Sequence, residues 1–457
     1  MEPSADNEKI NPASSELTPH RELARDIFSE LICIDTTEKN GSTKAAEAMY
    51  ERLKKAGFPE SDLHLAGPAP RNMNLVARLR GRGKYPPVLF IVHLDVVEAE
   101  RTDWSCDPFT FLEKDGYFYG RGTSDIKSEA AEIVSNLIRL KEEGFVPERD
   151  IIAALTEHEE AGNANGAQWL LENRRDLIDA EFVINLDSGG GSIFAGVPKL
   201  MEIQTGEKIF ANFTMRVHNK GGHSSLPVKD NAIYRLAEAL LRLSKYNFPI
   251  RLNETTRMFF ERALLLENGS VKEDMEALLK TPPDLNAAER VAQINPYYNA
   301  LMRTTCVATL LHGGHADNAL PQTAEANINC RMLPDEYAPD VLNTLKLVAA
   351  DSQVEITCPY ASFPSPLSPI RKDLFNLVED ITSSMWPGVV VTPVISNGAT
   401  DGKHFRRWGI PVYGISGMFL DMDDMRAHGK DERIGVKEFY DGIEFMYRFI
   451  KGLTSGL

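Results

Sequence analysis

The sequence predicts an α/β protein, in which a mostly parallel sheet carries helices on both faces and a smaller α+β domain is inserted. Apolar runs alternate with amphipathic helices up to about residue 200, which is typical of parallel sheets. Period-two alternation replaces this pattern after Met201 and indicates antiparallel strands. The first pattern then returns after "VEITCPY". At 457 residues the chain exceeds the roughly 250–300 residues at which single cores stop growing, so two domains are expected.

The first domain is predicted to consist of residues 1–198 and 357–457. Two helices are expected within residues 22–56, because apolar residues recur there every three or four positions. Strands and helices then alternate in the order strand 73–81, strand 87–95, helix 128–144, strand 150–158, helix 165–178 and strand 180–187. The chain closes with helix 371–386, strands 389–396 and 410–416, and helix 436–453.

The inserted domain is predicted to span residues 199–356. Residues 201–219 alternate as antiparallel strands do, residues 230–246 form an amphipathic helix, and residues 324–334 read as another strand. A largely helical, charged insertion lies near 251–303 and carries no chemical motif of its own.

Composition excludes several classes of function. Lys and Arg number 50 against 66 for Asp and Glu, which gives a net charge of −16. No run of basic residues is long enough to bind along a phosphate backbone. A nucleic-acid partner is therefore not expected. No segment approaches the roughly 18 apolar residues of a membrane span. The first twenty residues are polar and lack the apolar core of a signal peptide. The chain as given predicts a cytoplasmic protein, and export after removal of a leader is the alternative.

The cysteines predict neither a disulfide framework nor a thiolate metal site. The five are odd in number, scattered along the chain and without any CxxC spacing. They are interpreted as small buried apolar side chains, the usual role of an isolated cysteine.

Polar side chains follow the predicted strands at their carboxyl ends, where ligands of open parallel sheets bind. They are His93 and Asp95, Asp125, Glu159 and Glu160, Asp187, and, on a late loop, His428. Adjacent carboxylates at the end of the core strand "IIAALT" repel each other and need a compensating charge. Imidazoles and carboxylates together suit a pair of divalent metal ions, zinc before calcium. Glu160 is then expected to be a ligand, and Glu159 a base acting on the attacking water.

The segment "HLDVVEAERTDWSCDPFTFLEKDGYFYGRGTSDIKSE" resembles the signature of a di-zinc metallopeptidase family. That family includes acetylornithine deacetylase, succinyl-diaminopimelate desuccinylase, aminoacylases, carnosinase and the glutamate and Gly-X carboxypeptidases. The resemblance extends from about Leu23 to the C-terminus. It implies two Zn²⁺ per subunit, with Co²⁺ or Mn²⁺ as alternatives.

The resemblance also implies a role for each residue at the strand ends. His93 and Asp187 would belong to the first zinc site, Asp125 would bridge both metals, and His428 would complete the second site. Glu160 would be a further ligand and Glu159 the general base. Asp95 would accept the other imidazole proton of His93 and fix its tautomer.

Four further residues match substrate-binding positions of that family. His223, in "NKGGHSSLP", would reach across a homodimer to the oxyanion of the partner's substrate. Asn318 and Arg331 match positions that grip a substrate carboxylate, and Gly398, in "SNGATDGKHF", would present backbone to the substrate. His312 and His315 of "HGGH" are interpreted instead as solvated or structural residues.

The sequence therefore predicts a zinc-dependent hydrolase that cleaves a peptide or N-acyl amino acid next to a free carboxylate. An aminopeptidase or dipeptidase of the same architecture is the nearest alternative. A catalytically inactive binding module is disfavoured because no predicted ligand or base is missing. A di-metal phosphodiesterase is disfavoured because Arg331 is the one obvious anion clamp. Within the family, the long insertion favours the Gly-X carboxypeptidase and N-acyl amino acid hydrolase branch.

Overall fold

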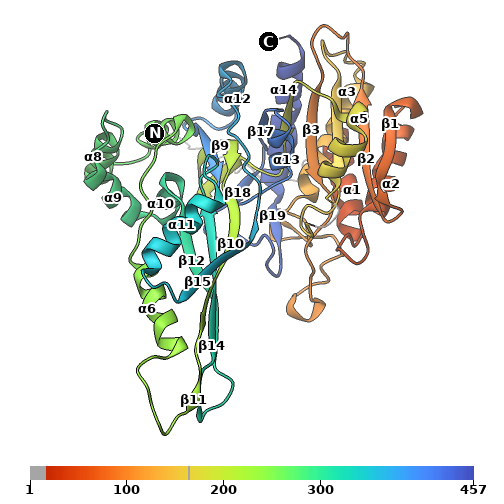
Figure 1. The fold of residues 1–457 in the computed structure, drawn as a ribbon. Coiled ribbons are helices and arrows are strands. Elements are labelled where there is room, and N and C mark those ends of the chain that lie inside the picture. Colours follow the sequence, from red (N-terminus) through yellow and green to blue (C-terminus); the bar gives the residue numbers. More distant parts are fainter. Residues whose placement is uncertain (1–16, 163–164, 457) are drawn as a thin grey trace, which may run out of the picture.

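A ten-stranded sheet forms the centre of the molecule (Figure 1). The computed structural model describes residues 17–162 and 165–456, so the polar segment 1–16 lies outside the described residues. Along the sheet the strands are β1 (Leu63–Ala69), β2 (Asn72–Leu79), β6 (Ile151–Thr156), β3 (Val88–His93), β7 (Phe182–Asn185), β17 (Val412–Gly414), β9 (Val197–Glu207), β8 (Gly190–Phe194) and β18 (Phe419–Asp421), with β16 (Val390–Ser396) paired to β9.

The middle of this sheet is parallel. β3 pairs in parallel with β6 on one side and with β7 on the other, and β7 pairs in parallel with β17. Antiparallel pairs join β1 to β2 and β2 to β6 at one edge. The mixed α/β class predicted from the sequence is confirmed.

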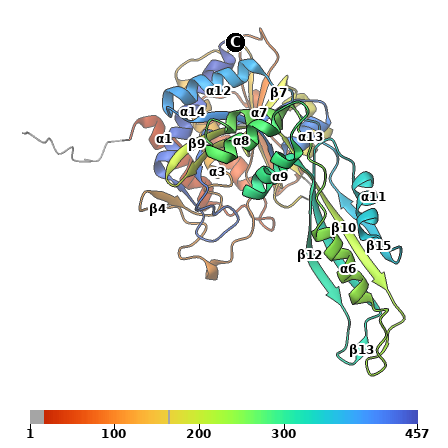
Figure 2. The ribbon, with the colours of Figure 1, turned by 90° about the vertical axis from the view of Figure 1, so that its left-hand side faces the viewer.

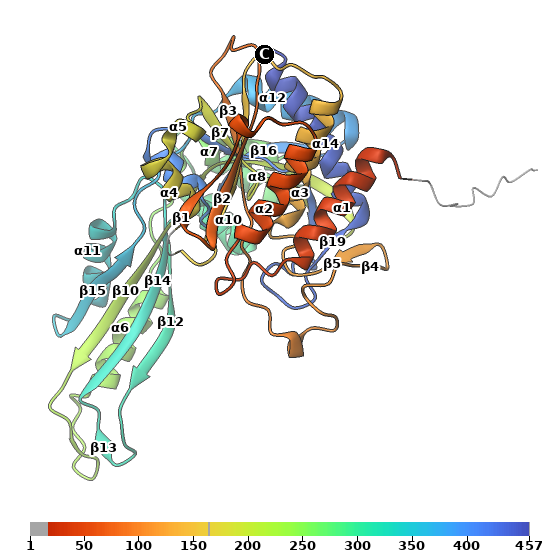
Figure 3. The ribbon, with the colours of Figure 1, turned by 90° about the vertical axis from the view of Figure 1, so that its right-hand side faces the viewer.

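Helices cover both faces of the sheet, as Figure 3 shows. Side chains of β3 alternate between two cores: Phe90 packs in one and Ile91 in the other, as the period of a strand requires. The first core contains α1 (Pro19–Cys33), α2 (Thr43–Lys55), α3 (Lys127–Glu142), α12 (Lys372–Met385) and α14 (Val436–Thr454). The second contains α4 (Gly166–Asn173), α5 (Arg175–Ile178) and α13 (Gly402–Arg407).

A second sheet extends from the main body as a long arm, here called the lid (Figures 1 and 2). Its four antiparallel strands are β12 (Thr305–Gly313), β14 (Thr323–Met332), β10 (Ile209–His218) and β15 (Val354–Ala361). Helices α6 (Ala232–Ser244) and α11 (Ala338–Ala349) bury its apolar face. The short strands β11 (Gly222–His223) and β13 (Ala319–Leu320) pair at the far tip.

The helical insertion packs against the main sheet. It comprises α7 (Glu254–Ala263), α8 (Gly269–Leu278), α9 (Leu285–Ile294) and α10 (Pro296–Met302), whose apolar core includes Val394 of β16. The hydroxyls of Thr205 on β9 and Thr255 on α7 lie 2.8 Å apart. The insertion thus braces the side of the main sheet from which the lid extends.

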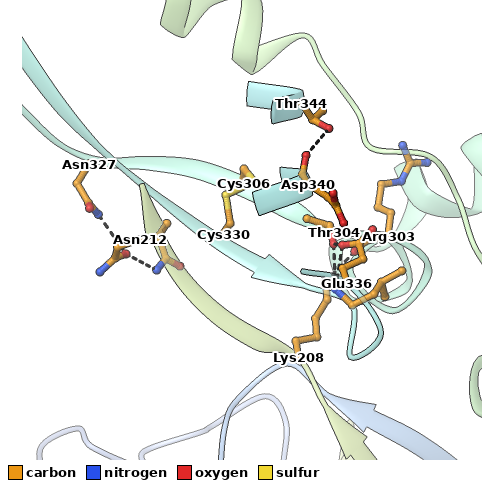
Figure 4. Close-up of a disulfide and its surroundings, with 12 residues drawn as sticks. Lys208, Asn212, Arg303, Thr304, Cys306, Asn327, Cys330, Glu336, Asp340 and Thr344 are labelled. Carbon is orange, nitrogen blue, oxygen red and sulfur yellow. Dashed lines mark hydrogen bonds between the residues drawn. A yellow bond between two sulfur atoms is a disulfide. The ribbon is translucent and has the colours of Figure 1, made fainter. Parts of the chain in front are cut away.

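A disulfide joins Cys306 of β12 to Cys330 of β14 (Figure 4). The prediction of no disulfide is wrong here, because the two residues are direct cross-strand partners with Cα atoms 4.1 Å apart. Their separation of 24 residues in the sequence does not reveal that they lie opposite each other on paired strands. Cys33, Cys106 and Cys358 are free, and Cys33 is exposed rather than buried.

A small three-stranded sheet joins the loop that contains Asp125 to the loop that contains His428. It consists of β4 (Leu112–Lys114), β5 (Tyr117–Tyr119) and β19 (Arg433–Gly435). β5 runs into the loop that contains Asp125, and β19 follows the loop that contains His428. Pairing of Gly435 with Tyr117 therefore brings the two loops to the same place. Among the described residues, no helix is long and apolar enough to cross a membrane.

Candidate metal centre and substrate site

The predicted metal-binding residues meet at one edge of the sheet because their strands are parallel neighbours. His93 ends β3, Glu159 and Glu160 follow β6, and Asp187 follows β7. Ligand atoms of His93, Glu159 and Asp187 all lie within 4.8 Å of one another, as do those of His93, Asp125 and Glu160. His93 therefore stands where two clusters of possible ligands adjoin.

Asp125 and His428 extend this arrangement. Nε2 of His93 lies 3.2 Å from Oδ1 of Asp125 and 3.7 Å from Oδ1 of Asp187. Nε2 of His428 lies 3.0 Å from Oδ2 of Asp125 and 2.7 Å from Oε1 of Glu160. The two oxygens of Asp125 thus face different imidazoles, which is the geometry that a bridging carboxylate needs.

Asp95 has a different contact from the one predicted. Nδ1 of His93 donates to the backbone carbonyl of Asp95 at 2.9 Å, whereas the Asp95 carboxylate lies 3.7 Å away. That carboxylate instead accepts the backbone N–H groups of Glu159, at 3.1 Å, and Glu160, at 3.0 Å. His158, which precedes the two glutamates, has a φ of 56°, a left-handed backbone conformation in which His is enriched. Asp95 therefore orients both glutamates.

Crowding of buried acids perturbs their protonation. Burial raises the pKa of Glu159 well above its usual range and that of Asp187 to about 7. Burial opposes a charged His93, yet the neighbouring Asp125 and Asp187 raise its pKa well above the usual value. Hydrogen bonds to Asp125 and Glu160 raise the pKa of His428 to about 10. The raised pKa values mean that these side chains bind protons, and a bound metal ion would displace those protons.

The donor chemistry fits a metal ion. Because a carbonyl oxygen can only accept, the proton of a neutral His93 is on Nδ1, and Nε2 turns its lone pair toward Asp125. When His93 is neutral, these two acceptors 3.2 Å apart repel unless a metal cation lies between them. Nitrogen and oxygen donors without a thiolate suit zinc, cobalt or manganese.

Glu432 is a functional residue that the sequence interpretation missed. It is fully buried, and its carboxylate accepts the backbone N–H groups of Gly122 (2.9 Å), Ser124 (2.7 Å) and Asp125 (3.0 Å). Nη1 of the buried Arg121 lies 2.7 Å from the same carboxylate. Because Glu432 follows His428 by four residues, it fixes the two loops that carry Asp125 and His428 relative to each other. Its place in "HGKDER", just after a predicted ligand, was the available signal.

Arg331 and Gly398 lie together on the side of the site where the lid meets the main sheet. Nη1 of Arg331 donates to the carbonyl of Asn397 at 3.2 Å, and the guanidinium carbon lies 4.8 Å from the centre of the Phe210 ring. Within residues 17–162 and 165–456, Arg331 pairs with no carboxylate, and burial lowers its pKa. A half-buried cation without a protein partner suits a substrate anion.

Asn318 and His223 lie elsewhere. The backbone of Asn318 accepts from Ser224 at 3.0 Å, and Nδ1 of His223 lies 2.7 Å from the Ser225 hydroxyl, both at the lid tip (Figure 1). Arg331 lies near the end of the ten-residue strand β14 that is farther from this tip, after roughly 30 Å of strand. The expected grip by Arg331 and Asn318 therefore does not form within one chain. His312 and His315 are exposed.

The chain matches Peptidase family M20/M25/M40 over residues 89–452. It is 30% identical over 381 residues to human N-fatty-acyl-amino acid synthase/hydrolase PM20D1, covering 81% of this chain and 74% of that protein. It is also 30% identical over 419 residues to the probable carboxypeptidase S-like 2 of Dictyostelium discoideum, covering 89% of this chain and 80% of that one.

Solved structures share the fold. A M20 family metallo-carboxypeptidase from Sulfolobus solfataricus superimposes with a TM-score of 0.69 at 19% identity, covering 95% of this chain and 99% of that one. A dinuclear metal binding peptidase of the M20 family from Bacillus subtilis superimposes with a TM-score of 0.61 at 10% identity, covering 96% and 99%.

The contacts of Glu432 lead to a testable prediction. Glu432→Gln should lower metal affinity by roughly 10- to 100-fold, because an amide has only one acceptor oxygen for three backbone donors. Metal titration of the folded variant checks this. Glu444→Gln, a partly exposed change on α14, serves as the control. Unchanged affinity in a Glu432 variant with native-like circular dichroism would show that the loops hold their positions without this carboxylate.

Proposed function

Because the chain belongs to the M20/M25/M40 peptidase family, we propose that it hydrolyses an amide bond next to a free carboxylate in a peptide or N-acyl amino acid. One observation carries this proposal: the imidazoles of His93 and His428 lie against the two different oxygens of Asp125. The relatives named as a carboxypeptidase and as an N-fatty-acyl-amino acid hydrolase support the substrate class.

Two metal sites follow from the donor geometry. His93, Asp125 and Asp187 would hold one ion, and Asp125, Glu160 and His428 the other, with Zn²⁺ preferred and Co²⁺ or Mn²⁺ as alternatives. Two such ions would supply Lewis-acid activation of water and of the scissile carbonyl. The dinuclear B. subtilis structure supports the number of ions.

Glu159 is the base in this proposal. Its N–H is held by Asp95, and its side chain faces a pocket beside His93 and Asp187. It takes a proton from the attacking water and delivers it to the leaving amine, a transfer that works best when the base has a pKa near neutral. Burial moves the pKa of Glu159 upward, in the required direction.

Replacing Glu159 distinguishes a base from a ligand, because its carboxylate also lies within ligand distance of His93 and Asp187. Glu159→Gln should lower kcat by roughly 10²–10⁴-fold, the contribution usual for general base catalysis, while two metals stay bound. Elemental analysis and single-turnover kinetics measure both. Loss of one metal would instead assign Glu159 to the ligands.

Arg331 is proposed to bind the substrate carboxylate, with the backbone at Gly398 beside it. A bidentate guanidinium contact contributes roughly 1.5–3 kcal/mol, so Arg331→Ala should lower kcat/KM about 10- to 100-fold. Amidation of that carboxylate should cost the native enzyme about as much and the variant far less. Arg216→Ala, on an exposed part of β10, is the matched control. Equal cleavage of free and amidated substrates would favour an aminopeptidase.

A homodimer is proposed because His223 and Asn318 lie at the lid tip, where a partner's active site could receive them. Apolar side chains of α6 and β12 are exposed on the lid, among them Tyr234 (60% exposed) and Leu311 (65% exposed). An exposed apolar surface of this kind is typical of an interface.

Complementation tests the dimer. His223→Ala and Glu159→Gln chains should each be inactive alone, and their heterodimer should regain activity, because one of its two sites receives both intact residues. Activity after subunit exchange, compared with each variant exchanged against itself, measures this. Absence of activity in isolated heterodimers would restrict His223 to its own chain.

A further inference from the structure

A pocket beside Glu159 is not accounted for by the metal centre or by Arg331. It lies between the start of α4, the segment of the lid that returns after β15, and α13. Glu159 is the one acidic residue among the described residues that line it, its basic residues are Lys403, His404 and Arg407, and its aromatic residues are Tyr360 and Phe363. Its volume of about 200 Å³ is below the roughly 300–1,000 Å³ of pockets that enclose a whole ligand, so it suits one substituent.

The cations of this pocket have no carboxylate partner. Arg406, between them in sequence, is buried and pairs with Glu207 at 2.9 Å. Lys403 and Arg407, by contrast, make no salt bridge within residues 17–162 and 165–456. Glu172, in the adjoining hollow, is held by Nε2 of Gln168 at 2.8 Å. The chain as a whole has a net charge of −16. By contrast, this pocket has two cations without a carboxylate partner beside the proposed base, and they suit the binding of an anion.

The aromatic wall holds one cation in place. The guanidinium carbon of Arg407 lies 3.8 Å from the centre of the Phe363 ring, although Phe363 is 65% exposed. Stacking fixes the plane of a guanidinium and leaves its N–H edge free for a carboxylate. Less ordering is then needed when an anion binds.

The same wall connects the pocket to Arg331. The ring of Tyr360 lies 5.8 Å from that of Phe210, over which the Arg331 guanidinium stacks at 4.8 Å. One ring of this aromatic pair thus contacts Arg331 and the other lines the pocket, which Glu159 also lines. A substrate whose scissile bond reaches Glu159 can present one anion to each.

We propose that this pocket, through Lys403 and Arg407, binds a second acidic group of the substrate, in addition to the carboxylate assigned to Arg331. This inference rests on the proposed function. An apolar substituent is disfavoured because Lys403 and His404 line the pocket, and it would leave their charge or polarity unsolvated. The second acid can belong to the acyl group or to the amino acid side chain.

Two pairs of substrates test the proposal and distinguish these sources. N-succinyl-leucine is compared with its neutral amide, N-succinamoyl-leucine, and N-acetyl-glutamate with N-acetyl-glutamine. With the zinc-loaded full chain, kcat/KM should favour the acid in at least one pair by about tenfold or more. The preference should weaken as ionic strength rises. Equal rates within both pairs would overturn the inference while leaving the proposed hydrolase intact.

Variants locate the preference. Arg407→Gln or Lys403→Gln should bring the acid-to-amide ratio toward one, and Arg407→Glu should reverse it. Arg448→Gln, an exposed change on α14 where Arg448 pairs with Glu444, should leave the ratio as it is. Ratios that survive both pocket substitutions in folded protein would place recognition elsewhere and overturn the inference.

Binding measurements test the pocket assignment independently of the proposed hydrolase activity. Calorimetry on the zinc-loaded Glu159→Gln chain should show tighter binding of the acid than of the amide, and Arg407→Gln should remove the difference. If no compound is hydrolysed but this selectivity holds, the proposed function fails and the pocket assignment stands. If neither hydrolysis nor binding distinguishes acid from amide, the pocket assignment fails.

Discussion

Mutual repulsion among half-buried carboxylates is the constraint on which the rest of this structure depends. Asp125, Glu159, Glu160 and Asp187 converge at the edge of a parallel sheet where two imidazoles turn toward them. Desolvation penalises the charges of Asp125, Glu159 and Asp187, and the proximity of the carboxylates adds to the cost. Protons can relieve the repulsion in part, as the raised pKa values of His93 and His428 indicate. Divalent cations relieve it more fully and leave the carboxylates as ligands.

The surrounding structure keeps these acids together. Asp95 holds the backbone of Glu159 and Glu160, and Glu432 holds the loop that ends at Asp125. Both supports are themselves buried carboxylates that accept several N–H groups, so their charge is stabilised locally. The small sheet of β4, β5 and β19 then links the Asp125 loop to the His428 loop. Contacts between protein groups thus hold the donors in place, which reduces the ordering that binding of an ion must impose.

Positive charge is distributed around this acidic centre rather than within it. Arg331 lies where the lid joins the main sheet, and Lys403 and Arg407 of α13 line the pocket beside Glu159. Asp401, just before α13, accepts from Thr156 at 2.8 Å and from Asn165 at 2.5 Å. The segment from Asn397 to Asp401 thus runs from the residue that contacts Arg331 to β6, the strand that precedes Glu159. Anchoring of α7 on β16 supports this side of the sheet.

The sequence by itself determined the fold class and the family, and it indicated which polar residues come together at one edge of the sheet. These were predictable because each depends on local pattern: the apolar run Ile151–Leu155 defines a core strand, and polar residues directly after parallel strands must share one edge. Only the tertiary structure decided the contacts between distant segments. Cys306 and Cys330 form a disulfide through the register of β12 and β14, and Asp95 supports His93 through its backbone carbonyl while its carboxylate supports Glu159 and Glu160. Glu432 supports Asp125 from 307 residues away, and Arg407 stacks on Phe363 from a different element. Such contacts depend on backbone geometry and on packing between segments, which residue type and spacing along the chain do not encode.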